Sequence, residues 1–123
     1  MRRVQVALIV ALSFAPAALA STANSDSLLA KSKAAEQAGN HDAALRFAQA
    51  AIVADPMRVS SYTALGDLYR RNNQSDFAAF YYAEALAIDP QDANAQLGLA
   101  LAEKQSQAQT AAANALDKDQ AQH

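Results

Sequence analysis

The sequence contains no cysteine, so it can form no disulfide bond and offers no thiolate for a metal site, for catalysis or for lipid attachment. Tryptophan is also absent, and glycine and proline occur only three times each. Sheets and their tight turns need more glycine and proline, whereas alanine, the strongest helix former, is abundant here. The composition therefore predicts an all-α fold.

Neither sign of charge dominates, because ten basic side chains face twelve acidic ones and the formal net charge is −2. A protein that binds nucleic acid through its phosphates needs an excess of Lys and Arg, so this balance argues against a nucleic-acid partner. The two histidines, His41 and His123, lie in a predicted turn and at the end of the sequence, which is no pattern for a metal site or a Ser-His-Asp triad. There is no glycine-rich phosphate loop either. We therefore expect no catalytic residues, no metal and no cofactor, and hence not an enzyme.

Residues 1–20 have the three parts of a secretory signal peptide. The basic start is Arg2-Arg3, an apolar run follows over residues 4–15, and residues 18–20 are an Ala-Leu-Ala cleavage site. An uncleaved anchor is the alternative, but the apolar run is shorter than the roughly 20 residues that a bilayer span needs. We expect no membrane insertion after the signal is removed.

Cleavage is expected before Ser21, and the small polar residues 21–25 are expected to form a flexible leader. Loss of Arg2 and Arg3 changes the formal net charge from −2 to −4. The short basic start and the alanine-rich cleavage region are typical of bacterial signals. The sequence therefore predicts a periplasmic protein, with secretion as the alternative.

Two stretches of equal length, residues 25–58 and 59–92, repeat each other without a gap. Each contains two amphipathic segments separated by a short break, and each ends with an Asp-Pro step, where proline stops a helix. In the first stretch we expect one helix from Asp26 to the break at Gly39-Asn40 and another over about Asp42–Ala54; in the second, the break is at residues 72–75. The identical pairs are Ser27/Ser61, Ala30/Ala64, Asp42/Asp76, Ala44/Ala78, Ala51/Ala85, Asp55/Asp89 and Pro56/Pro90.

This pattern resembles the tetratricopeptide repeat (TPR), a helical hairpin with a signature of aromatic and small residues at fixed places. The second repeat has most of that signature, whereas the first is degenerate and keeps only its small residues and its proline. The resemblance implies a TPR-type helix-turn-helix array that binds a protein or peptide. The matching residues are Tyr62, Leu65, Gly66, Tyr69, Ala78, Tyr82, Ala85 and Pro90 in residues 59–92, and Ala44, Ala51 and Pro56 in residues 25–58.

After the second repeat, apolar residues recur at helical spacing, and Asp92 is a suitable N-cap. We expect a capping helix over residues 93–116, because the last repeat of an array needs a polar cover against further stacking. Residues 117–123 are polar and low in complexity, and we expect them to be disordered.

In the family that the chain resembles, the first helix of each repeat lines a concave groove that holds the partner. The variant of that groove that clamps a terminal carboxylate is not expected here, because Leu29, Ala64 and Asp67 stand where it needs other polar or basic groups. Arg70-Arg71 either binds carboxylates of the partner or complements the dipole of a helix C-terminus. The groove positions are Leu29, Lys33, Glu36, Gln37, Thr63, Asp67, Arg70, Arg71, Leu97, Leu101 and Lys104.

Phe77 and Phe80 lie at second-helix places that are usually polar, and their spacing puts them on one helix face. They either form an exposed contact on the convex side or pack beneath the last helix or against a neighbouring side chain. Both interpretations stay open at this point.

These features together predict a non-enzymatic periplasmic TPR adaptor or scaffold that binds a peptide segment or protein domain of an envelope-assembly partner. The alternative is a structural self-assembly unit, either a homodimer or a small subunit of an envelope complex. The alternative is motivated by stability, because repeat arrays usually need about three units and this chain has two and a cap.

Overall fold

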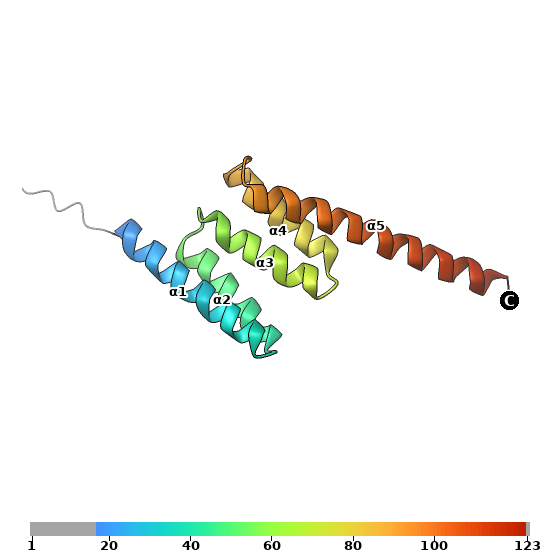
Figure 1. The fold of residues 1–123 in the computed structure, drawn as a ribbon, viewed down its shortest axis with the longest axis horizontal. Coiled ribbons are helices and arrows are strands. Elements are labelled where there is room, and N and C mark those ends of the chain that lie inside the picture. The colour runs from blue at the N-terminus through green and yellow to red at the C-terminus, as the bar shows by residue number, and fades with distance from the viewer. Residues whose placement is uncertain (1–16, 123) are drawn as a thin grey trace, which may run out of the picture.

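The computed structural model describes residues 17–122, with the side chains of residues 22–122. The basic start and apolar run predicted for the signal peptide therefore lie outside the described residues. Within residues 17–122 the chain forms five α-helices and no strand (Figure 1), so the predicted all-α fold is confirmed. The helices are α1 (Ala17–Gln37), α2 (His41–Ala54), α3 (Val59–Arg71), α4 (Ser75–Ile88) and α5 (Ala93–Ala121).

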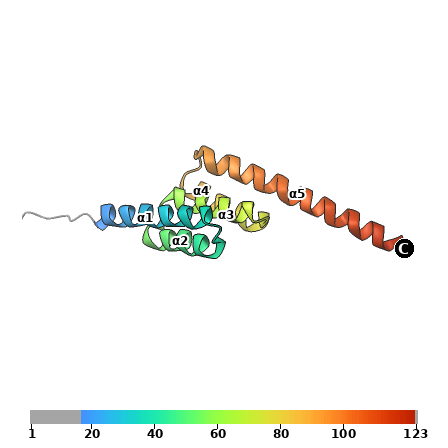
Figure 2. The ribbon, with the colours of Figure 1, turned by 60° about the horizontal axis from the view of Figure 1, so that its bottom comes forward.

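The helices form two hairpins, α1–α2 and α3–α4, with α5 packed on the second hairpin. The first helices of the successive units, α1, α3 and α5, lie beside one another in chain order, as Figures 1 and 2 show from two directions. This arrangement is a TPR-type helical array, as the sequence predicts.

The turns follow the same design in both hairpins. Gly39 ends the first helix of its hairpin with a left-handed φ of 77°, and Asn73, at the equivalent place of the second hairpin, has a φ of 60°. Each second helix ends where an aspartate N–H, at Asp55 and again at Asp89, donates to a carbonyl one helical turn earlier at 3.0 Å, just before a proline. Asp92 caps α5 by accepting from the N–H of Ala95 at 2.8 Å.

The core is built mostly from alanine, because small residues let helix axes approach closely. One cluster joins the two hairpins and centres on Ala44, Ala48, Leu65 and Leu68. A second cluster joins α4 to α5 and consists of Ala78, Tyr82 and Ala102, with partly buried neighbours such as Leu99.

Tyr82 is the largest fully buried side chain of the described residues. Its ring lies between Gly66 of α3 and Gly98 of α5. A Cβ atom at Gly66 would come within 2.7 Å of the ring carbon Cε1, and one at Gly98 would come closer still. The two glycines therefore make the space that the tyrosine fills.

The structure differs from the expected boundaries at the start of the first hairpin. Helix α1 begins at Ala17, so residues 21–25 are helical and not a flexible leader, and the cleavage position predicted before Ser21 lies within this helix. Ser25 is buried, donates to the carbonyl of Ala51 at 3.3 Å and lies 3.2 Å from the hydroxyl of Ser61. These contacts with α2 and α3 hold a segment whose composition alone indicates disorder.

The other boundaries also shift. Helix α2 begins at His41, one position earlier than expected, and Ser75 is the first residue of α4 and does not belong to the turn. Helix α5 continues to Ala121, so residues 117–121 are helical where disorder was expected. The segment contains no glycine or proline to end the helix.

The last part of α5 stands apart from the array. We call residues 110–121 the α5 extension; all of its side chains are exposed, and it projects beyond the other helices (Figure 1). None of the described helices is both long and apolar enough to cross a membrane.

Candidate functional site

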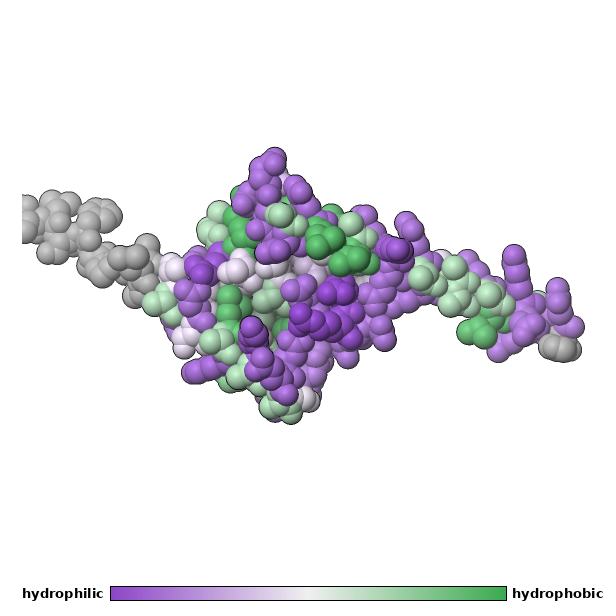
Figure 3. All heavy atoms as spheres, in the orientation of Figure 1, coloured by the Kyte–Doolittle hydropathy of each residue, from purple (hydrophilic) through white to green (hydrophobic). Residues whose placement is uncertain are grey.

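Two hollows lie side by side across the face formed by the first helices. One lies between α1 and α3 and has a volume of about 320 Å³; the other lies between α3 and α5 and has a volume of about 290 Å³. Asp67 lines both hollows, so together they form one continuous surface, which we call the groove. On the face drawn in Figure 3, strongly hydrophilic side chains lie directly beside hydrophobic ones. The first hollow is lined by Leu29, Ser32, Lys33, Glu36, Ala64, Asp67, Leu68 and Arg71, and the second by Thr63, Asp67, Arg70, Asn94, Leu97, Gly98 and Leu101.

Most of the groove positions expected from the sequence come together in these hollows. Gln37 and Lys104 are exposed but line neither hollow. The structure adds residues that sequence reasoning missed. They lie one helical turn or less from an expected position, so helical spacing is the signal that could have found them; they are Ser32, Leu68, Asn94 and Gly98. Ala64, considered above only as a place for a carboxylate clamp, also lines the first hollow.

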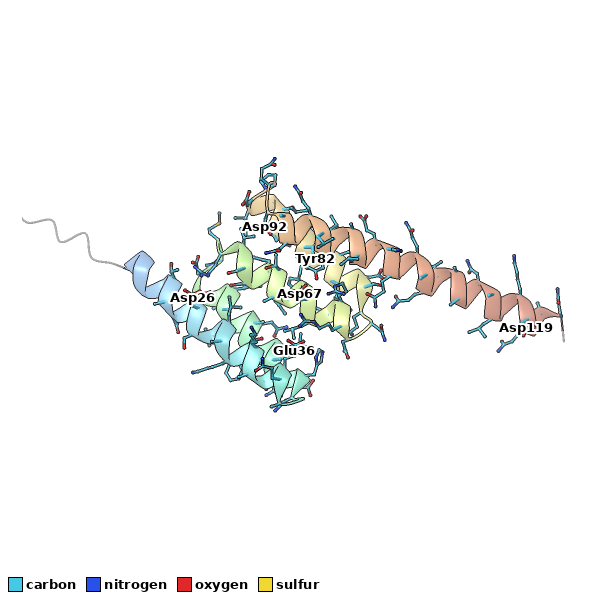
Figure 4. The ribbon with its side chains drawn as sticks, viewed as in Figure 1. Asp26, Glu36, Asp67, Tyr82, Asp92 and Asp119 are labelled. Carbon is cyan, nitrogen blue, oxygen red and sulfur yellow. The ribbon has the colours of Figure 1, made fainter. Side chains whose placement is uncertain are left out.

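A buried side chain from the second helix of the hairpin contacts two side chains of the groove. The hydroxyl of Tyr82 donates a hydrogen bond to the Asp67 carboxylate and accepts one from Arg70 Nε at 3.4 Å. Figure 4 shows Tyr82 and Asp67 on the neighbouring helices α4 and α3. Burial, and then the hydrogen bond to the Asp67 carboxylate, raise the pKa of Tyr82 to about 12. The hydroxyl therefore stays protonated at neutral pH and holds Asp67 in place as a donor.

An ion pair crosses the first hollow. Arg71 of α3 donates through Nη1 to the carboxylate of Glu36 in α1. The hydrogen bond to Glu36 raises the pKa of Arg71. One member lies on each hairpin, so this pair links α1 to α3.

The acidic side chains of the groove have partners within the protein, but most of its basic side chains form no ion pair with another described residue. Both of its carboxylates have partners within the protein, since Glu36 binds Arg71 and Asp67 binds Tyr82. Its basic side chains are Lys33, Arg70 and Arg71, and only the last has a carboxylate partner in an ion pair of the described residues. The groove therefore offers more positive charge than negative charge to a bound molecule, although the chain as a whole is acidic.

Phe77 and Phe80 are each 56% exposed. The Phe77 ring stacks on Tyr69 with centroids 5.3 Å apart, and the Phe80 ring meets Tyr81 edge-on at 5.2 Å. Each phenylalanine thus packs on a neighbouring tyrosine through part of its surface and leaves the rest open to solvent. A hollow of about 380 Å³, lined by Asp76, Phe77, Phe80 and Tyr81, lies between them; we call it the aromatic hollow.

No group of three or more His, Asp or Glu side chains among the described residues is placed to hold a metal ion.

Residues 59–92 match the model of the tetratricopeptide repeat family. The matched segment contains α3 and α4, and its bounds are those expected for the second repeat. The match supports the TPR family, and this family provides scaffolds for protein–protein interaction. A comparison with curated proteins gives no match.

Proposed function

We propose that this protein is a non-enzymatic periplasmic adaptor whose groove binds an extended or helical segment of an envelope-assembly partner. The observation that carries the proposal is the continuity of the groove over α1, α3 and α5, with Asp67 common to both hollows. Leucine side chains, Leu29 in one hollow and Leu97 and Leu101 in the other, provide apolar contact on either side of that aspartate.

The charge of the groove supports a partner segment that carries carboxylates. Glu36 and Asp67 already have partners within the protein, whereas neither Lys33 nor Arg70 forms an ion pair among the described residues. Guanidinium groups bind carboxylates well because their N–H groups match the spacing of the two oxygens. A segment with apolar residues on both sides of an acidic one therefore fits the groove.

The test is capture from a periplasmic extract with the purified protein, followed by identification of the bound segment and measurement of its affinity. Arg70→Glu combined with Arg71→Glu should weaken binding at least tenfold, because it reverses two charges of the groove. Helicity should stay close to that of the parent. Arg46→Glu is a control for charge reversal outside the groove, since Arg46 is exposed on α2 and lines neither hollow. Equal binding by the double variant would remove the arginines from the site.

The proposed periplasmic location is tested separately. The native protein should begin at Ser21 and be found in the periplasmic fraction, which N-terminal sequencing of the fractionated protein measures. An intact Met1 on a membrane-bound product would contradict it.

The alternative function is a self-assembly unit, and one observation favours it. The α5 extension is exposed on all sides and carries Leu116 at 66% exposure. A projecting helix of this length is marginal alone and gains from a partner. Sedimentation over a range of concentrations separates the two functions: a monomer that binds a foreign segment supports the adaptor, and a concentration-dependent dimer supports self-assembly.

A further inference from the structure

The aromatic hollow lies outside the groove and has a different chemistry. It is lined by four residues of α4, which are Asp76, Phe77, Phe80 and Tyr81. Their spacing places them on one face of the helix. Three of the four are aromatic rings and the fourth is a carboxylate.

The walls of the hollow are held by packing. Tyr69 stacks with Phe77 at 5.3 Å and with Tyr81 at 5.4 Å between ring centroids, and Phe80 stands at 84° to Tyr81. The rings are thus fixed on one side and open on the other, because both phenylalanines are 56% exposed. Asp76 is also held, since its Oδ1 accepts a hydrogen bond from Ser106 of α5 at 3.1 Å.

The wall of the hollow is mostly apolar, and Asp76 is its one charged residue. Helix α4 contains Asp76 and Glu84 but no Lys or Arg. The faces of aromatic rings are also negative, because of their quadrupole, and attract cations. The chemistry of the hollow therefore complements a positive group with a flat or apolar surface.

The first hairpin carries different residues at this place. The places of Asp76, Phe77, Phe80 and Tyr81 correspond, in the first repeat, to Asp42, Ala43, Arg46 and Phe47. Helix α2 thus carries an arginine four positions after the equivalent aspartate and directly before the equivalent aromatic residue, although this arginine forms no ion pair among the described residues. Helix α4 keeps the aspartate and the aromatic residue but has Phe80 where the arginine would be.

We propose that the aromatic hollow is a second binding site, which takes the guanidinium group of an arginine presented by a partner protein. The planar guanidinium can stack on a ring face of Phe77 or Phe80 while its N–H groups reach the Asp76 carboxylate. Arginine suits the site better than lysine, since an ammonium group cannot stack and hydrogen-bond in this way. The site is independent of the groove and needs no part of the groove's function.

The test is a titration of the isotope-labelled protein, followed by NMR, with the peptide acetyl-Ala-Leu-Arg-Leu-Ala-amide. The comparison peptide has citrulline, a neutral isostere, in place of arginine. The arginine peptide should shift the ring signals of Phe77, Phe80 and Tyr81, and the citrulline peptide should bind roughly threefold to thirtyfold more weakly. Equal binding of the two peptides, or no binding of the arginine peptide at these rings, would overturn the proposal.

Three variants sharpen the test. Phe80→Leu keeps apolar bulk but removes the ring, and Asp76→Asn removes the charge but keeps an oxygen for Ser106; each should weaken binding several-fold. Phe80→Arg gives α4 the residue that α2 has and should abolish binding by placing an internal cation at the site. Asp42→Asn, at the equivalent place in α2, is the matched control and should leave binding unchanged. Parent-like signals elsewhere in the spectrum establish that each variant is folded, and unchanged binding by both Phe80→Leu and Asp76→Asn would refute the site.

Discussion

The two hairpins share a backbone plan but fill the space between their helices in different ways. In the second, a large side chain, Tyr82, occupies room left by Gly66. In the first, the equivalent residues are Ala48 and Ser32, both buried, and the Ser32 hydroxyl donates to the carbonyl of Ala44 at 2.7 Å. The same backbone arrangement therefore accommodates two ways of packing the first helix of a hairpin against the second. One is a ring beside a glycine, and the other is two small residues with a hydrogen bond.

The difference explains which part of the chain matches the family. The TPR model matches residues 59–92, where the aromatic and glycine residues of the signature stand. The first hairpin has Ala35 where the second has Tyr69, so it lacks the large side chains by which a repeat is identified. Its helices nevertheless pair in the same way.

The largest expected effect comes from removing the tyrosine that distinguishes the hairpins. Tyr82→Ala should lower the free energy of unfolding by about 3–5 kcal/mol, because it empties a fully buried ring site between two glycines. Ala48→Gly, at the equivalent position, should cost about 1–2 kcal/mol through helix propensity and one lost methyl group. Urea unfolding followed by circular dichroism measures both, and equal losses would show that the two contacts have the same weight.

The stability of the second hairpin should also depend on alkaline pH. The pKa of Tyr82 is raised to about 12 in the folded protein, whereas a tyrosine in the unfolded chain ionises near 10. The folded state therefore binds more protons between these values, so stability is fully present below pH 10 and falls as the pH rises towards 12. The loss should reach about 2 kcal/mol by pH 11.5.

Tyr82→Phe is the control for this pH dependence. It keeps the ring but has no ionisable hydroxyl, so its stability should fall less steeply than that of the parent over the same range. Below pH 10 it should be less stable by about 1 kcal/mol, because the hydrogen bond to Asp67 is lost. Identical pH profiles for parent and variant would show that Tyr82 does not cause the loss.

An effect smaller than that of Tyr82→Ala is expected where α5 meets the second hairpin. Gly98→Ala places a methyl carbon too close to the Tyr82 ring, which must then move. We expect a net loss of about 1–3 kcal/mol from overpacking, measured by thermal unfolding. Combining it with Tyr82→Leu, which makes room for the methyl group, should give less than the sum of the two single losses. A simple sum would show that the two residues do not compete for space.

The smallest effect concerns the turns, where the hairpins carry different residues at the same left-handed position. Gly39→Asn copies the second turn into the first and should change stability by less than about 0.5 kcal/mol, because asparagine tolerates a positive φ. Gly39→Ala should cost about 1–2 kcal/mol, because the added Cβ disfavours this conformation. Similar losses for both variants would mean that the side-chain type does not matter at this turn.

Much of this protein follows from the sequence alone. The Asp-Pro steps, Gly39 and the recurrence of residues 25–58 in residues 59–92 predict two helical hairpins, because each signal acts through the backbone of its own segment. Helical spacing likewise placed most groove residues on one face, since side chains three or four positions apart share a face whatever surrounds them.

Other features were decided only by tertiary contacts. Residues 21–25 are small and polar and indicate a leader, yet Ser25 is buried against Ala51 and Ser61. No local pattern reports a hydrogen bond between residues so far apart in the sequence. The half-exposed state of Phe77 and Phe80 depends in the same way on where the rings of Tyr69 and Tyr81 lie.

Tyr82 shows most clearly which features the sequence determines and which the tertiary structure determines. Its place in the repeat predicts a buried aromatic residue, because that place belongs to the core face of its helix. That its hydroxyl reaches Asp67 and Arg70 in the groove follows from the room left by Gly66 and Gly98, which lie on two other helices. Sequence periodicity determines which face of a helix a residue occupies, and only the packing of three helices determines how far its side chain extends.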